Sequence, residues 1–153
     1  MSEARRMGTR RRIMAGAVAL VLLPGRGGAE TPAGTALAAA MREAMGDAIP
    51  VDGRIELWLP ELVDNGAQVP LAVMVASPMT AEDHIVAIAV FATGNPTPQV
   101  ARFELFPGLA RAEIETRIRV AEDQEIVVLA RDSGGKVWRA SAAVKVVHGG
   151  CRG

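Results

Sequence analysis

The stretch Ala112-Glu113-Ile114-Glu115-Thr116-Arg117-Ile118-Arg119-Val120 decides the fold class of this chain. Its even-numbered positions are small or apolar, whereas all of its odd-numbered positions are charged. Because successive side chains of a β-strand point to opposite faces, this period of two predicts a strand with one buried and one solvated face. Glu113, Glu115, Arg117 and Arg119 could be taken for a catalytic charge cluster, but we expect them to form the solvated face.

Strands of the same kind are expected along the rest of the chain. Ile55, Leu57 and Leu59 alternate with polar or large side chains. The other expected strands are Val69–Ala76, Ile85–Thr93, Val100–Phe106, Glu125–Arg131 and Lys136–Val147. Turn signals rich in Gly, Pro, Asn and Asp separate them. About seven short strands at this spacing predict an all-β fold, an immunoglobulin-like antiparallel β-sandwich.

One of these strands lacks the alternation. Residues 85–91 read Ile-Val-Ala-Ile-Ala-Val-Phe and are apolar on both faces. This pattern suits a central strand or a strand covered by a partner subunit, and the sequence leaves both open.

A short helix is expected before the strands. Residues Thr35 to Met45 are rich in strong helix formers, and Gly46 is a natural stop. We therefore expect an N-terminal helix and linker (30–53) before the immunoglobulin-like domain (54–147). The segments on either side, described below, are expected to be a signal peptide (1–29) and a flexible cysteine arm (148–153).

The N-terminal segment has the layout of an export signal. A basic region around Arg10-Arg11-Arg12 precedes the apolar run Ile13–Leu23, and small residues end at Ala29, where we expect cleavage. The apolar run has 11 residues, whereas a membrane-spanning helix needs about 20. We expect no membrane anchor. Thr9-Arg10-Arg11-Arg12-Ile13-Met14 has the order Thr-Arg-Arg-x-apolar-apolar, which is similar to a twin-arginine signal for folded cargo. The alternative is a general secretory signal, and we expect an exported, periplasmic protein.

The charge of the chain differs between its two parts. The whole chain has 17 basic and 17 acidic residues, but residues 1–29 contain six Arg and one Glu. The remainder therefore carries 11 basic and 16 acidic residues, a net charge of −5. An acidic mature domain argues against binding to nucleic acid, because little would neutralise the phosphates.

The single cysteine, Cys151, is the main candidate for chemistry. It follows Gly149-Gly150 and precedes Arg152-Gly153 at the end of the chain. A free Cys is often a buried small hydrophobe, but chain termini are poorly ordered unless they are tied down, so we expect an accessible thiol. A lone thiol in an oxidising compartment indicates intermolecular pairing or a reactive sulfur.

The two histidines are weaker candidates. His148 lies three residues before the thiol and could assist proton transfer, although an exposed histidine at a strand end is the simpler interpretation. His84 follows Glu82-Asp83, which suggests a metal site, but two acids and one His without further ligands make a weak one. We expect a structural or solvent role for His84 and no metal.

Several motifs resemble the SoxY family of thiosulfate-oxidation carriers. The block Pro60–Pro70 is similar to the family stretch P-x-[IL]-A-E-N-G-x-x-V-P, with Val63 and Asp64 in place of its usual Ala-Glu. Further similarities are Ser77-Pro78-Met79-Thr80, Asn95-Pro96-x-Pro98, Ala112-Glu113-x-x-Thr116-Arg117-Ile118-Arg119 and Gly149-Gly150-Cys151. The resemblance covers essentially the whole mature chain.

The resemblance implies a carrier without enzymatic activity of its own. Sulfur intermediates would be attached covalently to Cys151, with no other cofactor, while Gly149, Gly150 and Gly153 belong to the arm. It further implies a heterodimer with a SoxZ-type subunit. The transient partners would be a SoxXA-type haem protein, a SoxB-type hydrolase and a sulfane dehydrogenase.

The tail departs from the family pattern Gly-Gly-Cys-Gly-Gly, because Arg152 replaces a glycine. Arg152 adds bulk to an arm that must enter partner active sites, and it adds a positive charge that could hold an anionic sulfonate. The competing interpretation of the chain is an exported structural or interaction domain whose C-terminal thiol forms an intermolecular disulfide.

Overall fold

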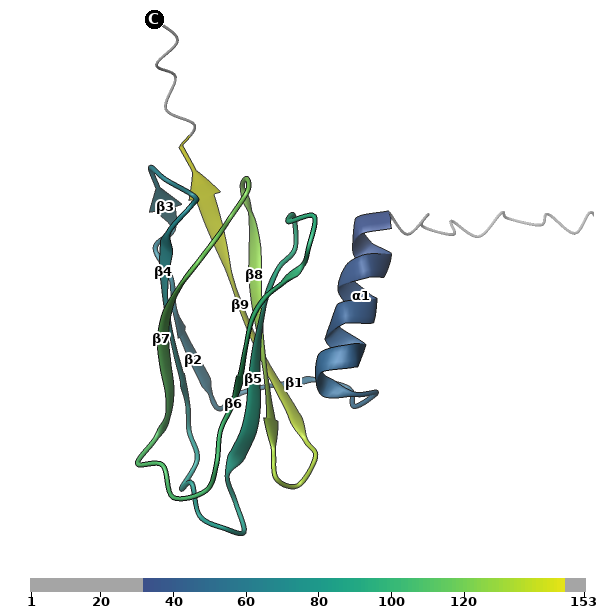
Figure 1. Cartoon of the computed structure of the whole chain (residues 1–153), viewed down its shortest axis with the longest axis vertical. Coiled ribbons are helices and arrows are strands. Elements are labelled where there is room, and N and C mark those ends of the chain that lie inside the picture. Colours follow the sequence, from purple (N-terminus) through teal and green to yellow (C-terminus); the bar gives the residue numbers. More distant parts are fainter. Residues whose placement is uncertain (1–31, 148–153) are drawn as a thin grey trace, which may run out of the picture.

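The computed structural model describes residues 32–147, which form a two-layer β-sandwich with one helix packed against it (Figure 1). One sheet has the strand order β1-β9-β8-β5-β6, and β3 also pairs with β9. The other sheet has the order β2-β4-β7. The elements are α1 (Pro32–Met45), β1 (Val51–Asp52), β2 (Ile55–Trp58), β3 (Leu62–Val63), β4 (Val69–Val75), β5 (Ile85–Ala92), β6 (Gln99–Glu104), β7 (Ala112–Ile118), β8 (Gln124–Asp132) and β9 (Val137–Val146). The all-β, immunoglobulin-like fold class is confirmed, and seven of the strands are longer than two residues.

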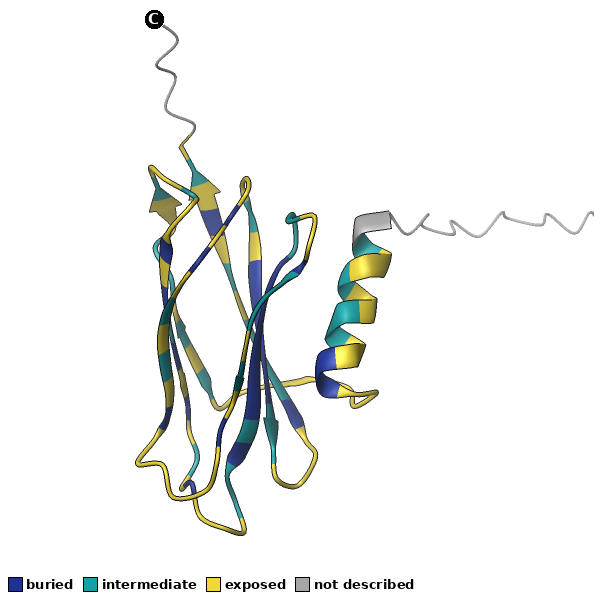
Figure 2. Cartoon of the chain, viewed as in Figure 1, coloured by how far each residue is buried: buried dark blue, intermediate teal, exposed yellow. Residues whose placement is uncertain are grey.

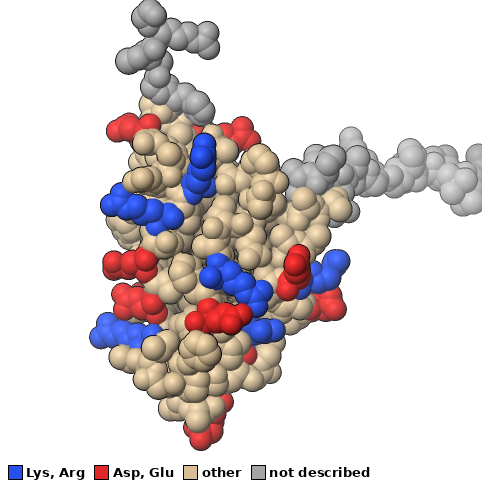
Figure 3. Space-filling view, viewed as in Figure 1, with Lys and Arg blue, Asp and Glu red and all other residues tan. Residues whose placement is uncertain are grey.

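Strand β7 has the two faces that its sequence predicts. It pairs antiparallel with β4 along its whole length. Ala112 and Ile118 are buried in the core, whereas Glu113, Glu115 and Arg117 are exposed. The charged row is therefore the outer face of the three-stranded sheet, as expected. Figure 3 shows acidic and basic side chains along this side of the molecule.

Strand β5 lies between β8 and β6 and is buried on both faces (Figure 2). Ile88 and Val90 point into the core between the two sheets, whereas Ala89 and Phe91 point to a second core beneath α1. The continuous apolar run thus marks a central strand. Its second face is covered by the chain's own helix.

Helix α1 covers this face with an apolar stripe. Leu37, Met41 and Met45 recur at a spacing of four residues and pack against β5 and β8. The helix ends where the sequence predicts, because Gly46 has a φ of 80° and its N–H donates a 2.7 Å hydrogen bond to the Arg42 carbonyl. It begins at Pro32, three residues before the predicted start, since proline is well suited to a first helical turn. Within residues 32–147, no helix has the length and hydrophobicity that crossing a membrane requires.

Two short strands were not predicted. Val51–Asp52 and Leu62–Val63 form β1 and β3, and both run parallel to β9. They are the exceptions in an otherwise antiparallel arrangement. Strand β1 lies inside the segment expected to be a linker (30–53), so part of that segment belongs to the large sheet. Two-residue strands carry no measurable periodicity, which is why a pattern search along the chain does not find them.

Candidate functional site

The candidate site is the end of the sandwich from which the C-terminal residues leave. The residues predicted to form the arm, Gly149, Gly150, Cys151, Arg152 and Gly153, lie outside the described residues, as does His148. The structure does describe the point where they attach. Strand β9 ends at Val146, and the described chain ends at Val147, beside β3 (Figure 1).

Three consecutive backbone N–H groups are hydrogen-bonded at this point. Lys145 donates to the Glu61 carbonyl at 2.8 Å, and Val147 donates to the Val63 carbonyl at 2.8 Å. Val146, which faces the other way, donates to Oδ1 of Asp123 at 2.8 Å. We call these three hydrogen bonds the root clamp. Together they hold the last described residues from both sides.

The turn between β3 and β4 packs closely on the same region. The Asn65 side chain accepts a 2.9 Å hydrogen bond from the Ala67 N–H, which fixes the turn. The Val120 N–H donates a 2.7 Å hydrogen bond to the Gly66 carbonyl. A Cβ atom at Gly66 would overlap the Val120 carbonyl oxygen and press on Val146, so only glycine fits. The Asn65-Gly66 pair of the family-like block therefore has a structural role beside residues 145–147, which we call the root.

A second family-like residue, Asn95, holds the neighbouring loop. Its Nδ2 donates to the Arg119 carbonyl at 2.8 Å, and its Oδ1 accepts from the Ala121 N–H at 3.0 Å. Its Oδ1 also accepts from Nε2 of Gln124 at 3.0 Å. Residues 119–124 are thus fixed by Asn95 on one side and by Gly66 on the other. Asp123 belongs to this fixed segment.

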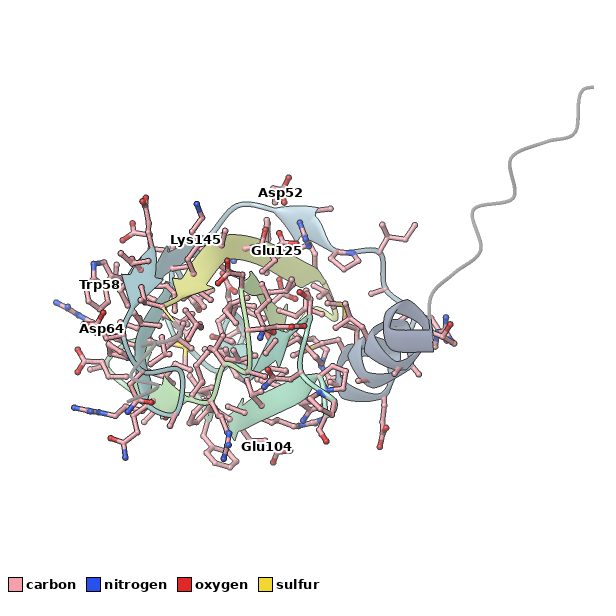
Figure 4. All side chains as sticks on the ribbon, turned by 90° about the horizontal axis from the view of Figure 1, so that it is seen from above. Asp52, Trp58, Asp64, Glu104, Glu125 and Lys145 are labelled. Carbon is pink, nitrogen blue, oxygen red and sulfur yellow. The ribbon has the colours of Figure 1, made fainter. Side chains whose placement is uncertain are left out.

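Charged side chains of both signs surround the root. Figure 4 looks at the sandwich from above and shows Asp64 at the margin of the three-stranded sheet and Lys145 on β9. A shallow depression at this end is lined by residues 64–67, 119–121 and 146–147. Arg119 contributes to this lining, and none of its side-chain atoms forms a hydrogen bond or ion pair with the described residues.

His84 immediately precedes β5, away from the root. Its backbone N–H donates to Oγ of Ser133 at 3.3 Å, and its carbonyl accepts from the Ser133 N–H at 2.8 Å. Nδ1 of the ring is buried and has no hydrogen-bond partner within residues 32–147. In the same range, no three His, Cys, Asp or Glu side chains gather closely enough to hold a metal ion. The structure thus places His84 in a backbone contact between two loops.

Comparison with known proteins gives agreement in both sequence and structure. Residues 41–151 match the family described as "Sulfur oxidation protein SoxY". The structure described as "Structure of the sulfur carrier protein SoxY from Chlorobium limicola f thiosulfatophilum" is 31% identical. It superposes with a TM-score of 0.62 and covers 73% of this chain and 96% of its own. No curated protein matches the chain.

Superoxide reductases share the fold at lower identity. A variant of the superoxide reductase (neelaredoxin) from Ignicoccus hospitalis is 18% identical with a TM-score of 0.56, and covers 71% of this chain and 86% of its own. A putative superoxide reductase from Thermotoga maritima is 22% identical with a TM-score of 0.53, covering 65% and 93%. At these identities the likeness shows the β-sandwich architecture alone.

The fold and the hydrogen-bonded end of β9 first define a class of protein, that of β-sandwich domains with a helix packed against the larger sheet. The family match and the 31% identical structure then settle the membership within that class. The chain belongs to the SoxY family of sulfur oxidation proteins. This membership supports a sulfur-carrier role in sulfur oxidation, and the match extends to Cys151 itself.

Sequence reasoning missed the groups that hold the root. Two of them are backbone carbonyls, those of Glu61 and Val63, and any residue type could supply these. The third is the carboxylate of Asp123, one of 17 acidic residues in the chain. A single Asp just before a strand has no sequence signature of this role.

Proposed function

We propose that this chain is a periplasmic covalent sulfur carrier that holds thiosulfate-derived intermediates on Cys151. Gly149, Gly150, Arg152 and Gly153 form the arm that presents this thiol to separate enzymes. The observation that carries the proposal is the family match, which runs from the helix to Cys151. It is supported by the root, because the last strand ends at the outside of the sandwich with its final residues fixed.

The chemistry of loading can be written with its balance. The thiol and thiosulfate combine as Cys–SH + S₂O₃²⁻ → Cys–S–S–SO₃⁻ + H⁺ + 2e⁻, and a SoxXA-type haem protein accepts the two electrons. A SoxB-type hydrolase then cleaves the terminal sulfur–sulfur bond with water, giving Cys–S–SH, sulfate and a proton. A sulfane dehydrogenase, where present, oxidises the sulfur that stays on the arm. The carrier supplies the thiol and the reach, and its partners supply the catalysis.

The proposal includes a partner and a location. A SoxZ-type subunit forms a heterodimer with this chain, as the family resemblance implies. Residues 1–29 act as a twin-arginine-type signal, so the domain is exported already folded. Such export would also allow a folded partner without its own signal to travel along.

The decisive experiment is intact-mass analysis of the protein purified from cells that oxidise thiosulfate. The carrier role predicts masses on Cys151 that correspond to sulfane or thiosulfonate groups, and dithiothreitol should remove them. The alternative role, an interaction domain joined by an intermolecular disulfide, predicts a linked dimer without such adducts. A disulfide-linked homodimer alone would overturn the proposal.

Replacement of Cys151 by Ser tests the attachment site directly. We expect thiosulfate-dependent flux to be lost while the urea unfolding midpoint is unchanged, because the residue follows the folded sandwich. Ser141→Ala, an exposed change on β9, is the matched control and should keep the flux. Flux that persists in Cys151→Ser would rule out attachment at this thiol.

Arg152→Gly tests the unusual tail. If the bulk of Arg152 hinders entry into partner sites, the glycine variant is loaded and processed faster by SoxXA-type and SoxB-type enzymes. If its charge holds the anionic adduct, the variant is processed more slowly. The sign of the change in rate distinguishes a drift from the family tail from an adaptation to other partners.

A further inference from the structure

We propose that Asp123 is a positioning residue that sets where the sulfur-carrying arm begins and in which direction it leaves the sandwich. The inference deepens the proposed function and rests on it. It follows from the root clamp, in which the Asp123 carboxylate accepts the Val146 N–H on the side of β9 that β3 leaves free.

The geometry of β9 requires such a partner. Strand β3 pairs with β9 at Lys145 and Val146 in a parallel register. The carbonyls of Glu61 and Val63 accept hydrogen bonds from the N–H groups of Lys145 and Val147. The N–H of Val146 points the opposite way, toward β8. The last β9 residue that pairs with β8 is Val144, opposite Gln124. Within residues 32–147, the Asp123 carboxylate thus accepts a β9 N–H just beyond the last residue pair of β8 and β9.

The segment that carries Asp123 is itself fixed. Asn95 binds the Arg119 carbonyl and the Ala121 N–H, while Gly66 accepts from Val120. The Gly94 N–H also donates a 2.8 Å hydrogen bond to Oε1 of Gln124. A carboxylate on so constrained a loop can hold Val146 in one place. The family-like motifs that contain Gly66 and Asn95 thus both help to fix the position of the Asp123 side chain.

The consequence for the thiol is a defined reach. From Val147, an extended chain places Cys151 at most roughly 13 Å away. If residues 145–147 separated from the sandwich, the length of chain between the sandwich and Cys151 would grow by about 10 Å. The effective concentration of the thiol at a docked active site would fall roughly two-fold, because it decreases as about the −3/2 power of tether length. The clamp keeps the arm short and its origin constant.

Hydrogen exchange and distance measurements on the full chain test this role. Asp123→Ala should speed exchange of the Val146 amide on the order of tenfold, the equivalent of one charge-assisted hydrogen bond. Exchange of the Val128 amide in the centre of β8 should stay within about two-fold, because the core is untouched.

Nitroxide labels on Cys151 and on Ser141→Cys should give a broader and longer distance distribution in Asp123→Ala. Asp123→Asn, whose amide oxygen can still accept, should restore most of the exchange protection and the narrower distribution.

Two further variants separate positioning from a general loss of charge or stability. Glu122→Ala removes the adjacent exposed acid and should behave as the unmodified chain. Asn95→Ala loosens the segment that carries Asp123 and should reproduce a smaller version of the Asp123→Ala effect.

Unchanged Val146 exchange and unchanged label distances in Asp123→Ala would overturn the proposal. Equal acceleration at Val146 and Val128 would also overturn it, because it would mean that Asp123 only stabilises the fold. The exchange and distance measurements do not depend on any sulfur compound. If they show the expected effects but Cys151 carries no sulfur adduct in cells, the carrier function is refuted and the positioning role of Asp123 is not.

Discussion

The carbonyl of Gly66 accepts a 2.7 Å hydrogen bond from the Val120 N–H, and the two backbones lie so close that no side chain fits between them. This contact joins the turn after β3 to the loop after β7, and Val146 of β9 packs against the same glycine. Three separate parts of the sequence therefore meet at the root of the C-terminal tail.

Gly66→Ala should destabilise the domain by about 1–3 kcal/mol, the usual cost of inserting a methyl group where there is no space. Urea unfolding followed by circular dichroism measures this change. Gly134→Ala is the matched control, because its Cβ would meet only the side chain of Asp132, and it should cost less than about 1 kcal/mol. Equal stability of the Gly66 variant and the unmodified chain would contradict the close approach.

Met45→Ala should destabilise the domain by about 2–4 kcal/mol, because it leaves a cavity between α1 and the sheet. Met45 is 3% exposed and belongs to the core that contains Phe91 and Leu129. Glu43→Ala, on the exposed side of the same helix, should change the free energy of unfolding by less than about 0.5 kcal/mol. If both variants unfolded at the same urea concentration, α1 would not cover the sheet in solution.

Replacements of Arg54 test backbone strain at the start of β2. Arg54 has a φ of 56°, which is unfavourable for any residue with a side chain, and its guanidinium lies 4.9 Å from the Trp138 ring centroid. Arg54→Gly and Arg54→Ala both lose the contact with Trp138, but only glycine relieves the backbone. We expect the glycine variant to be more stable than the alanine variant by about 1 kcal/mol in thermal unfolding. The reverse order would show that the positive φ is absent.

The two tryptophans should differ in their access to solvent. Trp58 is 62% exposed, whereas Trp138 is partly buried and its Nε1 donates a 3.1 Å hydrogen bond to Asp132. Acrylamide should therefore quench the fluorescence of Trp138→Phe, which retains Trp58, several-fold more strongly than that of Trp58→Phe. Similar quenching constants for the two variants would refute this placement.

The seven strands longer than two residues were readable from the sequence because each has a simple local pattern. The alternation from Ala112 to Val120 predicts one buried face. The uninterrupted apolar run from Ile85 to Phe91 predicts a strand buried on both faces, and the sheet order places it in the middle of a sheet. The helix and its end at Gly46 were readable for the same reason. The Asn65-Gly66 and Asn95 motifs were visible as a family resemblance, although no local pattern explained what they do.

The sequence by itself determined the fold class, the length of the helix to within one turn, the family and the identity of the single cysteine. These depend on local periodicity and on residue type, which a linear pattern retains. Only the tertiary structure decided that α1 covers β5, that two-residue strands run beside β9, and that Asp123 meets Val146. The physical reason is that these contacts join residues far apart in the chain through backbone groups or one ordinary carboxylate, and only the folded arrangement brings them within hydrogen-bonding distance.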